Sequence, residues 1–190
     1  MRLFIAIPVP SSPTFASVQR DIAQAVPGAR LTATDDQHIT VRFLGEVFDA
    51  QPVMAALAAA CRGRPALPAI IEGVGTFPGG RFPAHKHARV VWAGVRAAGI
   101  DALANAIVAA TAGFGEPPEA RPFVAHVTLA RLPRPTDLRD LVEQHHSTLF
   151  AQGDLDRVVL FRSHMGPGAA RHEPLLTIPL GPAGRRDGQA

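Results

Sequence analysis

The sequence predicts an α+β fold of two lobes related by an approximate two-fold axis, with two mostly antiparallel sheets facing a central cleft and helices outside. Three observations lead to this prediction. Segments of alternating hydrophobicity follow segments of helical periodicity, the order strand, helix, strand, helix, strand occurs twice, and matching elements lie about 86 to 88 positions apart. Two copies of so long a unit indicate an internal duplication, because a solenoid stacks several shorter repeats.

The first copy is recognised from alternation, helical spacing and turn residues. Its predicted elements are a strand at 3–9, a helix at about 13–26, a strand at 38–45, a helix at about 50–62 and a strand at 67–77. Ser12 and Pro13 are typical of a helix start, and Pro27 with Gly28 ends the first helix. Asp49 is the predicted cap of the second helix.

The second copy follows a loop at 78–86 that is rich in glycine, proline and basic residues. Its predicted elements are a strand at 89–95, a helix at about 100–107, a strand at 123–132, a helix capped by Thr136 and a strand at 155–162. One more strand at 174–180 closes the chain. We therefore expect one domain over residues 1–180, with lobes at about 1–77 and 88–163, and a disordered tail at 181–190.

Composition narrows the function classes. Of the 190 residues, 47% are hydrophobic and 18% are charged, which excludes a disordered or fibrous chain, and no apolar stretch is long enough to cross a bilayer. Cys61 is the only cysteine, so an internal disulfide and a cysteine-rich zinc site are excluded. The first residues lack the apolar core of a signal peptide, and we expect a cytoplasmic protein.

One four-residue pattern is repeated at equivalent places in the two copies. His38-Ile39-Thr40-Val41 and His126-Val127-Thr128-Leu129 are separated by 88 positions, each in the second strand of its copy. Because strand residues alternate faces, each histidine shares a face with its threonine. A lone histidine is usually structural, but folding does not require a polar histidine at the same place twice. The repeat therefore predicts a functional site.

Two histidines around a two-fold axis suit acid and base catalysis. A neutral imidazole takes a proton and an imidazolium donates one near neutral pH. In-line displacement at phosphorus needs these groups at the attacking and leaving oxygens, on opposite sides of the phosphorus. Threonine hydroxyls are suited to hydrogen-bond the non-bridging oxygens.

The arrangement resembles the two-histidine phosphoesterase superfamily and, within it, the RNA 2′,3′-cyclic phosphodiesterases, also called 2′-5′ RNA ligases. The segments that resemble this family are RLFIAIPVP, HITVRFLGEV, RVVWAGV, RPFVAHVTLAR and VVLFRSHMGPGAAR. The resemblance implies metal-independent hydrolysis of a terminal 2′,3′-cyclic phosphate to a 2′-phosphate, without a cofactor, on RNA ends or small nucleotides. It also implies that ATP-independent 2′-5′ ligation is possible at the same site.

The resemblance also implies roles for particular residues. His38 is then the proton donor, His126 the proton acceptor, and Thr40 and Thr128 bind the phosphate. Five positions after each histidine, Phe43 is expected to contact the nucleoside and Arg131 the phosphate, although strict alternation places both on the opposite face unless the strand is bulged. Alternation instead places Arg42 on the face of His38.

Other interpretations remain open at this point. A non-catalytic RNA or nucleotide-binding module is the alternative function, and a metallohydrolase is a third, although His85, His87 and the pair His145-His146 lack further ligands nearby in sequence. The loop around Lys86 is either a basic rim for RNA or merely solvated. His172 stands where the family commonly has an aromatic residue. We expect a monomer with no metal, no membrane association and no obligate protein partner.

Overall fold

The computed structural model describes residues 1–33, 36–78, 85–164 and 171–181. Its elements in chain order are β1 (Arg2–Pro8), α1 (Pro13–Ala25), β2 (Arg30–Leu31), β3 (His38–Glu46), α2 (Gln51–Cys61), β4 (Leu67–Phe77), β5 (Ala88–Ala97), α3 (Ile100–Thr111), β6 (His126–Thr136), α4 (Arg139–Gln144), β7 (Leu149–Leu155), β8 (Arg157–His164) and β9 (Arg171–Pro179). Strands β2 and β7 are the elements that the sequence did not predict. Residues 182–190 of the predicted tail and residues 79–84 of the predicted loop lie outside the described residues.

The predicted helix caps are partly right. Ser12 caps α1 by accepting a hydrogen bond from the backbone amide two residues later at 3.2 Å. Asp49 is not the N-cap of α2, but it precedes the cap and accepts from the amide of Gln51 at 2.9 Å. Thr136 is not the cap of α4, because β6 extends to it and the helix starts after Leu138.

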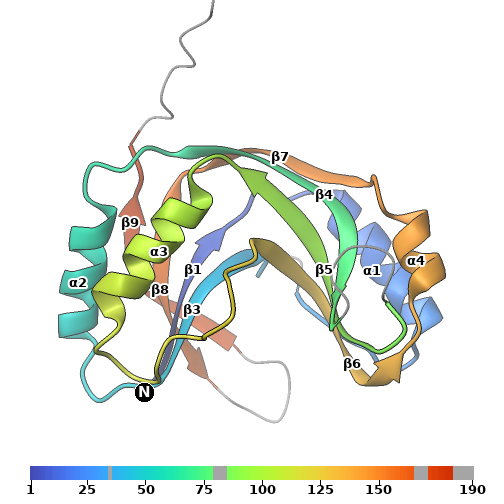
Figure 1. The fold of residues 1–190 in the computed structure, drawn as a ribbon, viewed down its shortest axis with the longest axis horizontal. Coiled ribbons are helices and arrows are strands. Elements are labelled where there is room, and N and C mark those ends of the chain that lie inside the picture. Colours follow the sequence, from blue (N-terminus) through green and yellow to red (C-terminus); the bar gives the residue numbers. More distant parts are fainter. Residues whose placement is uncertain (34–35, 79–84, 165–170, 182–190) are drawn as a thin grey trace, which may run out of the picture.

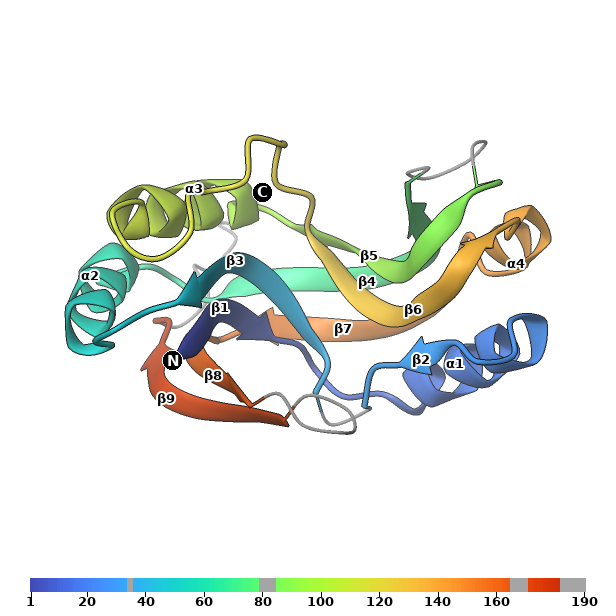
Figure 2. The same ribbon diagram turned by 90° about the horizontal axis from the view of Figure 1, so that it is seen from below.

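The α+β prediction is confirmed, but the two predicted sheets are joined into one. Antiparallel strands follow one another in the order β7-β4-β5-β6-β3-β1-β8-β9, with β2 paired to β6. The two halves of this sheet meet where β3 and β6 pair at a single position, Ile39 opposite Val127. Figure 1 shows the sheet as an arch with α2 and α3 at one end and α1 and α4 at the other. Figure 2 shows the same arch from below.

The strand order corrects the predicted lobes at 1–77 and 88–163. Strand β4 of the first copy pairs with β5 and β7, whereas β8 of the second copy pairs with β1 and β9. The helices follow the same exchange, since α1 packs against β6 and β7 while α3 packs against β3 and α2. We call the half with β3, β1, β8 and β9 the first lobe, and the half with β6, β5, β4 and β7 the second lobe. Each lobe thus contains segments from both copies, because hydrophobic periodicity specifies elements but not their partners.

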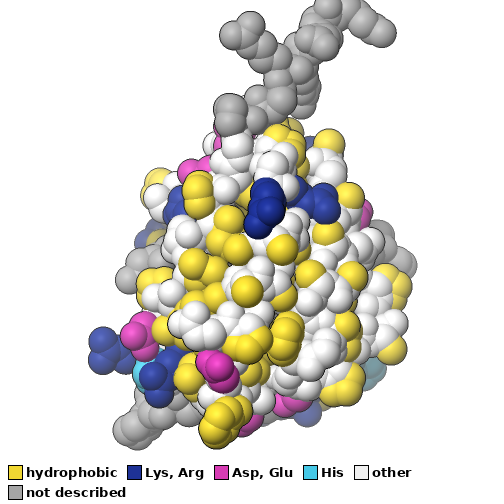
Figure 3. All heavy atoms as spheres, turned by 90° about the vertical axis from the view of Figure 1, so that its left-hand side faces the viewer, with side chains coloured by type: hydrophobic (Ala, Val, Ile, Leu, Met, Phe, Trp, Pro, Cys, Tyr) yellow, Lys and Arg dark blue, Asp and Glu magenta, His cyan; other side chains and the backbone are white. Residues whose placement is uncertain are grey.

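The core lies between the convex face of the sheet and the helices. Residues such as Ile22, Leu57 and Ile107 are fully buried there. Figure 3 views the end formed by α2 and α3, where apolar and uncharged side chains predominate. No helix among the described residues is long and apolar enough to cross a membrane. The concave face of the sheet, which the helices do not cover, is left for the polar motifs.

Candidate active site

The two His-x-Thr motifs lie side by side where the lobes meet. Their second residues, Ile39 and Val127, are opposite one another and fully buried. In an antiparallel pair this register places each histidine opposite the threonine of the other motif. The four polar side chains, which are half-buried, therefore occupy one face as a square: His38, Thr40, His126 and Thr128. Diagonal residues in such a pair are about 7–8 Å apart, which leaves room for one phosphate group between the imidazoles.

Each histidine ring is held by the same local hydrogen bond. His38 Nδ1 lies 2.7 Å from the carbonyl oxygen of Asp36, and His126 Nδ1 lies 2.6 Å from that of Val124. A carbonyl accepts and does not donate, so Nδ1 carries the hydrogen in both rings. The lone pair of each neutral ring is therefore on Nε2, the nitrogen directed away from its own backbone.

A bulge after each motif decides which later residues share the face of the histidines. The register between β1 and β3 skips Val41, and that between β5 and β6 skips Leu129, again 88 positions apart. Each bulge reverses the alternation, so that Phe43 and Arg131 are exposed on the concave face. The expectation that Arg42 shares the face of His38 is wrong, because its side chain is buried on the convex side and only 5% exposed.

Arg42 fixes the first bulge from behind. Its guanidinium donates to Thr111 Oγ1 at 2.7 Å and to the carbonyl oxygens of Phe114 and Glu116 at 3.0 and 2.8 Å. Burial lowers the pKa of Arg42, and these acceptors partner its two terminal nitrogens in the core, whereas its buried Nε has no hydrogen-bond partner among the described residues. Gly115, at φ +63°, lies so close to β3 that a Cβ atom there clashes with the Leu44 carbonyl. The segment after α3 is therefore clamped along β3.

The side chain of Gln19 in α1 holds the second bulge through two hydrogen bonds to backbone carbonyls. Its buried amide donates to the carbonyl oxygens of Thr32 at 2.7 Å and Leu129 at 2.9 Å. The amide of Thr32 also donates to Leu129 at 3.0 Å, so the residue skipped by the ladder is tied to β2 and α1. Sequence reasoning missed this role, because a glutamine on a helix carries no signal of its partner across the chain.

An aromatic cluster supports His38 in the first lobe. Phe4 of β1 lies 5.4 Å from the His38 ring and is stacked on Phe161 at 5.1 Å between centroids. His172 of β9 meets Phe4 edge-on at 4.7 Å and lies 6.0 Å from His38. His172 is thus part of the wall beside the first histidine.

A second aromatic cluster supports His126. Phe77 meets the His126 ring edge-on at 5.0 Å, and Trp92 lies 6.1 Å from it. The Trp92 ring covers Gly75, where any Cβ atom would clash with it. Sequence reasoning also missed these residues, although Phe4 and Trp92 are themselves 88 positions apart, which is a signal that the repeat could have revealed.

The surroundings of His126 favour its neutral form. Burial is the main cause of the lowered pKa of His126, and the positive charges of Arg131 and of protonated His38 lower it further. The hydrogen bond to Val124 opposes this effect but does not reverse it. An imidazole whose pKa is below its usual value near 6.5 is mostly unprotonated at neutral pH and can act as a base.

Two arginines, Arg30 and Arg131, lie on the concave face of the second lobe beyond the motifs, and we call them the basic row. Arg30 of β2 is opposite Arg131 of β6, which is in turn opposite Val90 of β5. Like charges in a cross-strand pair repel, so this pair favours a bound anion.

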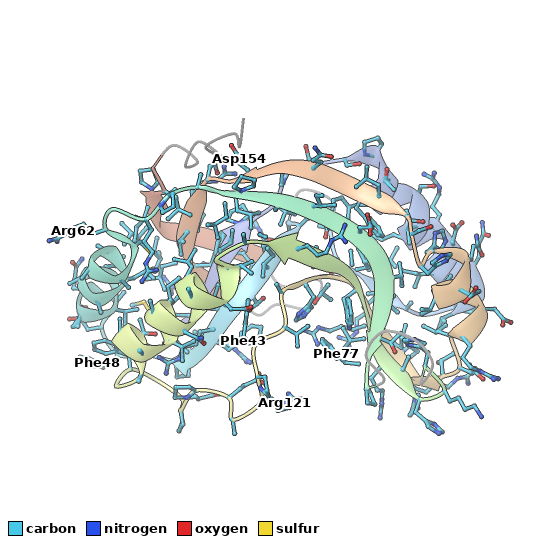
Figure 4. The ribbon with its side chains drawn as sticks, turned by 45° about the horizontal axis from the view of Figure 1, so that its top comes forward. Phe43, Phe48, Arg62, Phe77, Arg121 and Asp154 are labelled. Carbon is cyan, nitrogen blue, oxygen red and sulfur yellow. The ribbon has the colours of Figure 1, made fainter. Side chains whose placement is uncertain are left out.

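Figure 4 shows Phe43 and Phe77 beneath the arch, reaching from its opposite arms. Phe43 is 49% exposed and offers a free ring face.

The remaining histidines do not join this site. His85 is buried with its Nδ1 2.9 Å from Thr76 Oγ1, so it is not part of a basic rim. His145 lies between Asp21 and Thr148, at 3.1 Å from a side-chain oxygen of each, and ties α1 to the end of α4. Among the described residues, no three histidine, cysteine or acidic side chains are grouped as a metal site.

Known proteins resemble the chain over most of its length. The family model described as the 2′-5′ RNA ligase superfamily matches residues 31–167. A Geobacillus stearothermophilus protein named RNA 2′,3′-cyclic phosphodiesterase is 30% identical over 188 residues, covering 93% of this chain and 56% of the relative. A Methanocaldococcus jannaschii protein of the same name is 26% identical over 181 residues, covering 91% of this chain and 97% of the relative. The chain thus spans little more than half of the first relative and nearly all of the second.

Solved structures share the arch. The crystal structure of TT0787 of Thermus thermophilus superposes with a TM-score of 0.77 at 26% identity, covering 96% of this chain and 99% of that one. The crystal structure of E. coli LigT complexed with 3′-AMP gives a TM-score of 0.66 at 27% identity, covering 94% of this chain and 97% of that one.

Proposed function

Because the chain belongs to the 2′-5′ RNA ligase superfamily, we propose that it is an RNA 2′,3′-cyclic phosphodiesterase. It hydrolyses a terminal 2′,3′-cyclic phosphate to a 2′-phosphate, with the 3′ oxygen as the leaving group. The observation that carries this proposal is the matched pair of imidazoles on one face, each tied through Nδ1 to the carbonyl two residues before it. The names of the two relatives support the same reaction.

In the proposed mechanism, His126 is the base and His38 is the acid. The Nε2 atom of neutral His126 takes a proton from water as the water oxygen bonds to phosphorus. The bond between phosphorus and the 3′ oxygen breaks, and the His38 imidazolium donates its Nε2 proton to that oxygen. Protons and charge balance, and each histidine ends in the form in which the other started, so exchange with solvent restores both.

The other motif residues stabilise the charge that develops on the phosphate. The hydroxyls of Thr40 and Thr128, at the two remaining corners of the square, donate to the non-bridging oxygens. Arg131 supplies a positive charge on the same face, and the exposed ring of Phe43 stacks with the nucleoside. No step requires a metal ion. A 5′-hydroxyl in place of water makes a 2′-5′ linkage at the same site, although water at ~55 M favours hydrolysis by mass action.

A module that binds RNA without turning it over is the alternative. It needs the arginines and Phe43, but it does not need two imidazoles with matched tautomers on one face. The lowered pKa of His126 also costs binding, because a neutral ring attracts a phosphate less than a charged one does. These features favour catalysis.

The experiment that tests the proposal is incubation of the protein with a short RNA ending in a 2′,3′-cyclic phosphate, in the presence of EDTA. We expect a 2′-phosphate product, identified by chromatography against 2′- and 3′-phosphate standards. A 3′-phosphate product contradicts the assignment of the leaving oxygen. Absence of any product while the RNA remains bound favours the binding module, and activity that EDTA abolishes favours a metallohydrolase.

The basic row predicts a dependence on substrate length. Arg131→Gln is expected to lower kcat/KM by roughly 10-fold to 100-fold on every substrate, because a charge-assisted hydrogen bond contributes about 1.5–3 kcal/mol. Arg30→Gln is expected to lower kcat/KM for a cyclic phosphate-ended oligonucleotide but not for a cyclic mononucleotide, which has no second phosphate to reach it. Arg62→Gln, at the far end of α2 (Figure 4), is the control for the change in net charge. Equal effects of Arg30→Gln on both substrates contradict the prediction.

A further inference from the structure

A single carboxylate lies between two histidines beside the first motif. Asp36 Oδ1 is 3.6 Å from His38 Nδ1, and Asp36 Oδ2 is 3.3 Å from His172 Nε2. The side chains are 15%, 29% and 17% exposed for His38, Asp36 and His172. The carboxylate is therefore partly shielded from water, where its charge acts more strongly than on an open surface.

His172 is held in one orientation by packing. Its ring meets Phe4 edge-on at 4.7 Å with an interplanar angle of 73°, and it is nearly perpendicular to the His38 ring at 85°. Its Nδ1 is buried with no hydrogen-bond partner among the described residues, which suits a lone pair and not a hydrogen. Burial is the main cause of the lowered pKa of His172, so the ring is neutral. With the lone pair on Nδ1, its hydrogen is on Nε2, which lies 3.3 Å from Asp36 Oδ2.

We propose that His172 and Asp36 are a positioning pair for His38: the neutral His172 ring fixes the Asp36 carboxylate, and the carboxylate stabilises the His38 imidazolium. This inference rests on the proposed function, in which His38 is the acid. The pair also explains why one motif histidine acts as the acid and the other as the base. The position equivalent to Asp36 in the second motif is Val124, which has no carboxylate, and the charge of Arg131 acts on His126 more strongly than the opposing charge of Glu119.

Three titratable groups face His38: Asp36 from the turn before β3, His172 from β9 and His126 from β6. The pKa values of both neighbouring histidines are lowered, so both are uncharged at neutral pH. The carboxylate is then the one ionised neighbour in this set.

The test is the pH profile of kcat/KM for cyclic phosphate hydrolysis. The alkaline limb of a bell-shaped profile reports loss of the proton from the acid. Asp36→Asn, which keeps the backbone carbonyl, is expected to move this limb to lower pH by roughly half a unit to one unit and to leave the acid limb in place. His172→Phe keeps a ring beside Phe4 but removes the donor, and a smaller shift in the same direction is expected. His172→Gln restores a donor and is expected to recover part of the shift.

Two controls separate positioning from general damage. His164→Gln removes a histidine that is also paired with a carboxylate, Glu173 at 2.8 Å, in the same pair of strands, and no shift is expected. The double variant of Asp36→Asn and His172→Phe is expected to shift no further than Asp36→Asn alone, because both act through one group. If the shift of the alkaline limb in the double variant equals the sum of the shifts in the two single variants, the two residues act independently and the proposed pairing is wrong.

NMR titration of the histidine side chains gives a readout that needs no activity. The midpoint for His38 is expected to fall in Asp36→Asn and in His172→Phe, while that of His126 is expected to move less, because only the charge on His38 connects it to the pair. If cyclic phosphate is not hydrolysed but the His38 midpoint moves, the proposed function fails and the pairing stands. If wild type is active and neither the limb nor the midpoint moves, the pairing fails and the function stands.

Discussion

Replacing either motif histidine by alanine is expected to reduce kcat for cyclic phosphate hydrolysis by roughly 10²-fold to 10⁴-fold, the usual contribution of one acid or base. His38→Ala removes the proton donor and His126→Ala removes the base, while neither side chain belongs to the apolar core. Affinity for the RNA is expected to change by only a few-fold, because phosphate and nucleoside contacts remain. Single-turnover rates and equilibrium binding measure the two quantities separately.

His145→Gln is the matched control, since it removes a histidine that ties α1 to the end of α4 and belongs to neither motif. If both alanine variants keep their rate and lose only affinity, the two-histidine mechanism is wrong and the protein is a binding module.

The two alanine variants are further distinguished by a substrate whose leaving group needs no acid. Replacing the 3′ oxygen of the cyclic phosphate by sulfur gives a thiolate leaving group that departs without protonation. On this substrate His38→Ala is expected to recover most of its lost rate, whereas His126→Ala remains slow because attack by water still needs a base. If His126→Ala recovers its rate on this substrate and His38→Ala does not, His126 is the acid and His38 is the base.

Replacing Arg42 by methionine is expected to lower the free energy of unfolding by about 3 kcal/mol. The change removes three hydrogen bonds from one buried guanidinium and leaves acceptors on Thr111, Phe114 and Glu116 without a donor. Unsatisfied buried acceptors cost about 1–3 kcal/mol each, and the losses are not additive when the segment relaxes. Urea unfolding followed by circular dichroism measures the difference.

Two further substitutions calibrate this result. Thr111→Val removes one of the three contacts at nearly constant volume, and a loss of about 1 kcal/mol is expected. Arg157→Met breaks an exposed ion pair with Asp156, where a loss well under 1 kcal/mol is expected. A loss for Arg42→Met no larger than that for Arg157→Met means that the clamp on the first bulge contributes little.

Much of the site could be predicted because it depends on local pattern. The histidine and threonine of each motif are two residues apart in a strand, and that spacing alone places them on one face. The repeat at 88 positions then indicates that the two faces are related. Periodicity and turn residues likewise predicted the main helices and strands, since these depend on side chains close together in the chain.

The remaining features depend on hydrogen bonds between distant segments. Whether Phe43 or Arg42 faces the substrate is decided by one residue left out of the ladder with β1, and pattern along β3 does not contain that information. The exchange of β4 and β8 between lobes is decided by strand pairing, which is why the contiguous lobes predicted from the repeat are wrong.

By itself, then, the sequence determined the duplicated α+β fold, the two motifs and the face on which each motif lies, because these follow from spacing along one strand. Only the tertiary structure decided that the motifs meet at Ile39 and Val127, that bulges turn Phe43 and Arg131 inward, and that Asp36 and His172 lie beside His38. The physical reason is that a bulge or a cross-strand contact is fixed by backbone and side-chain partners far away in the chain.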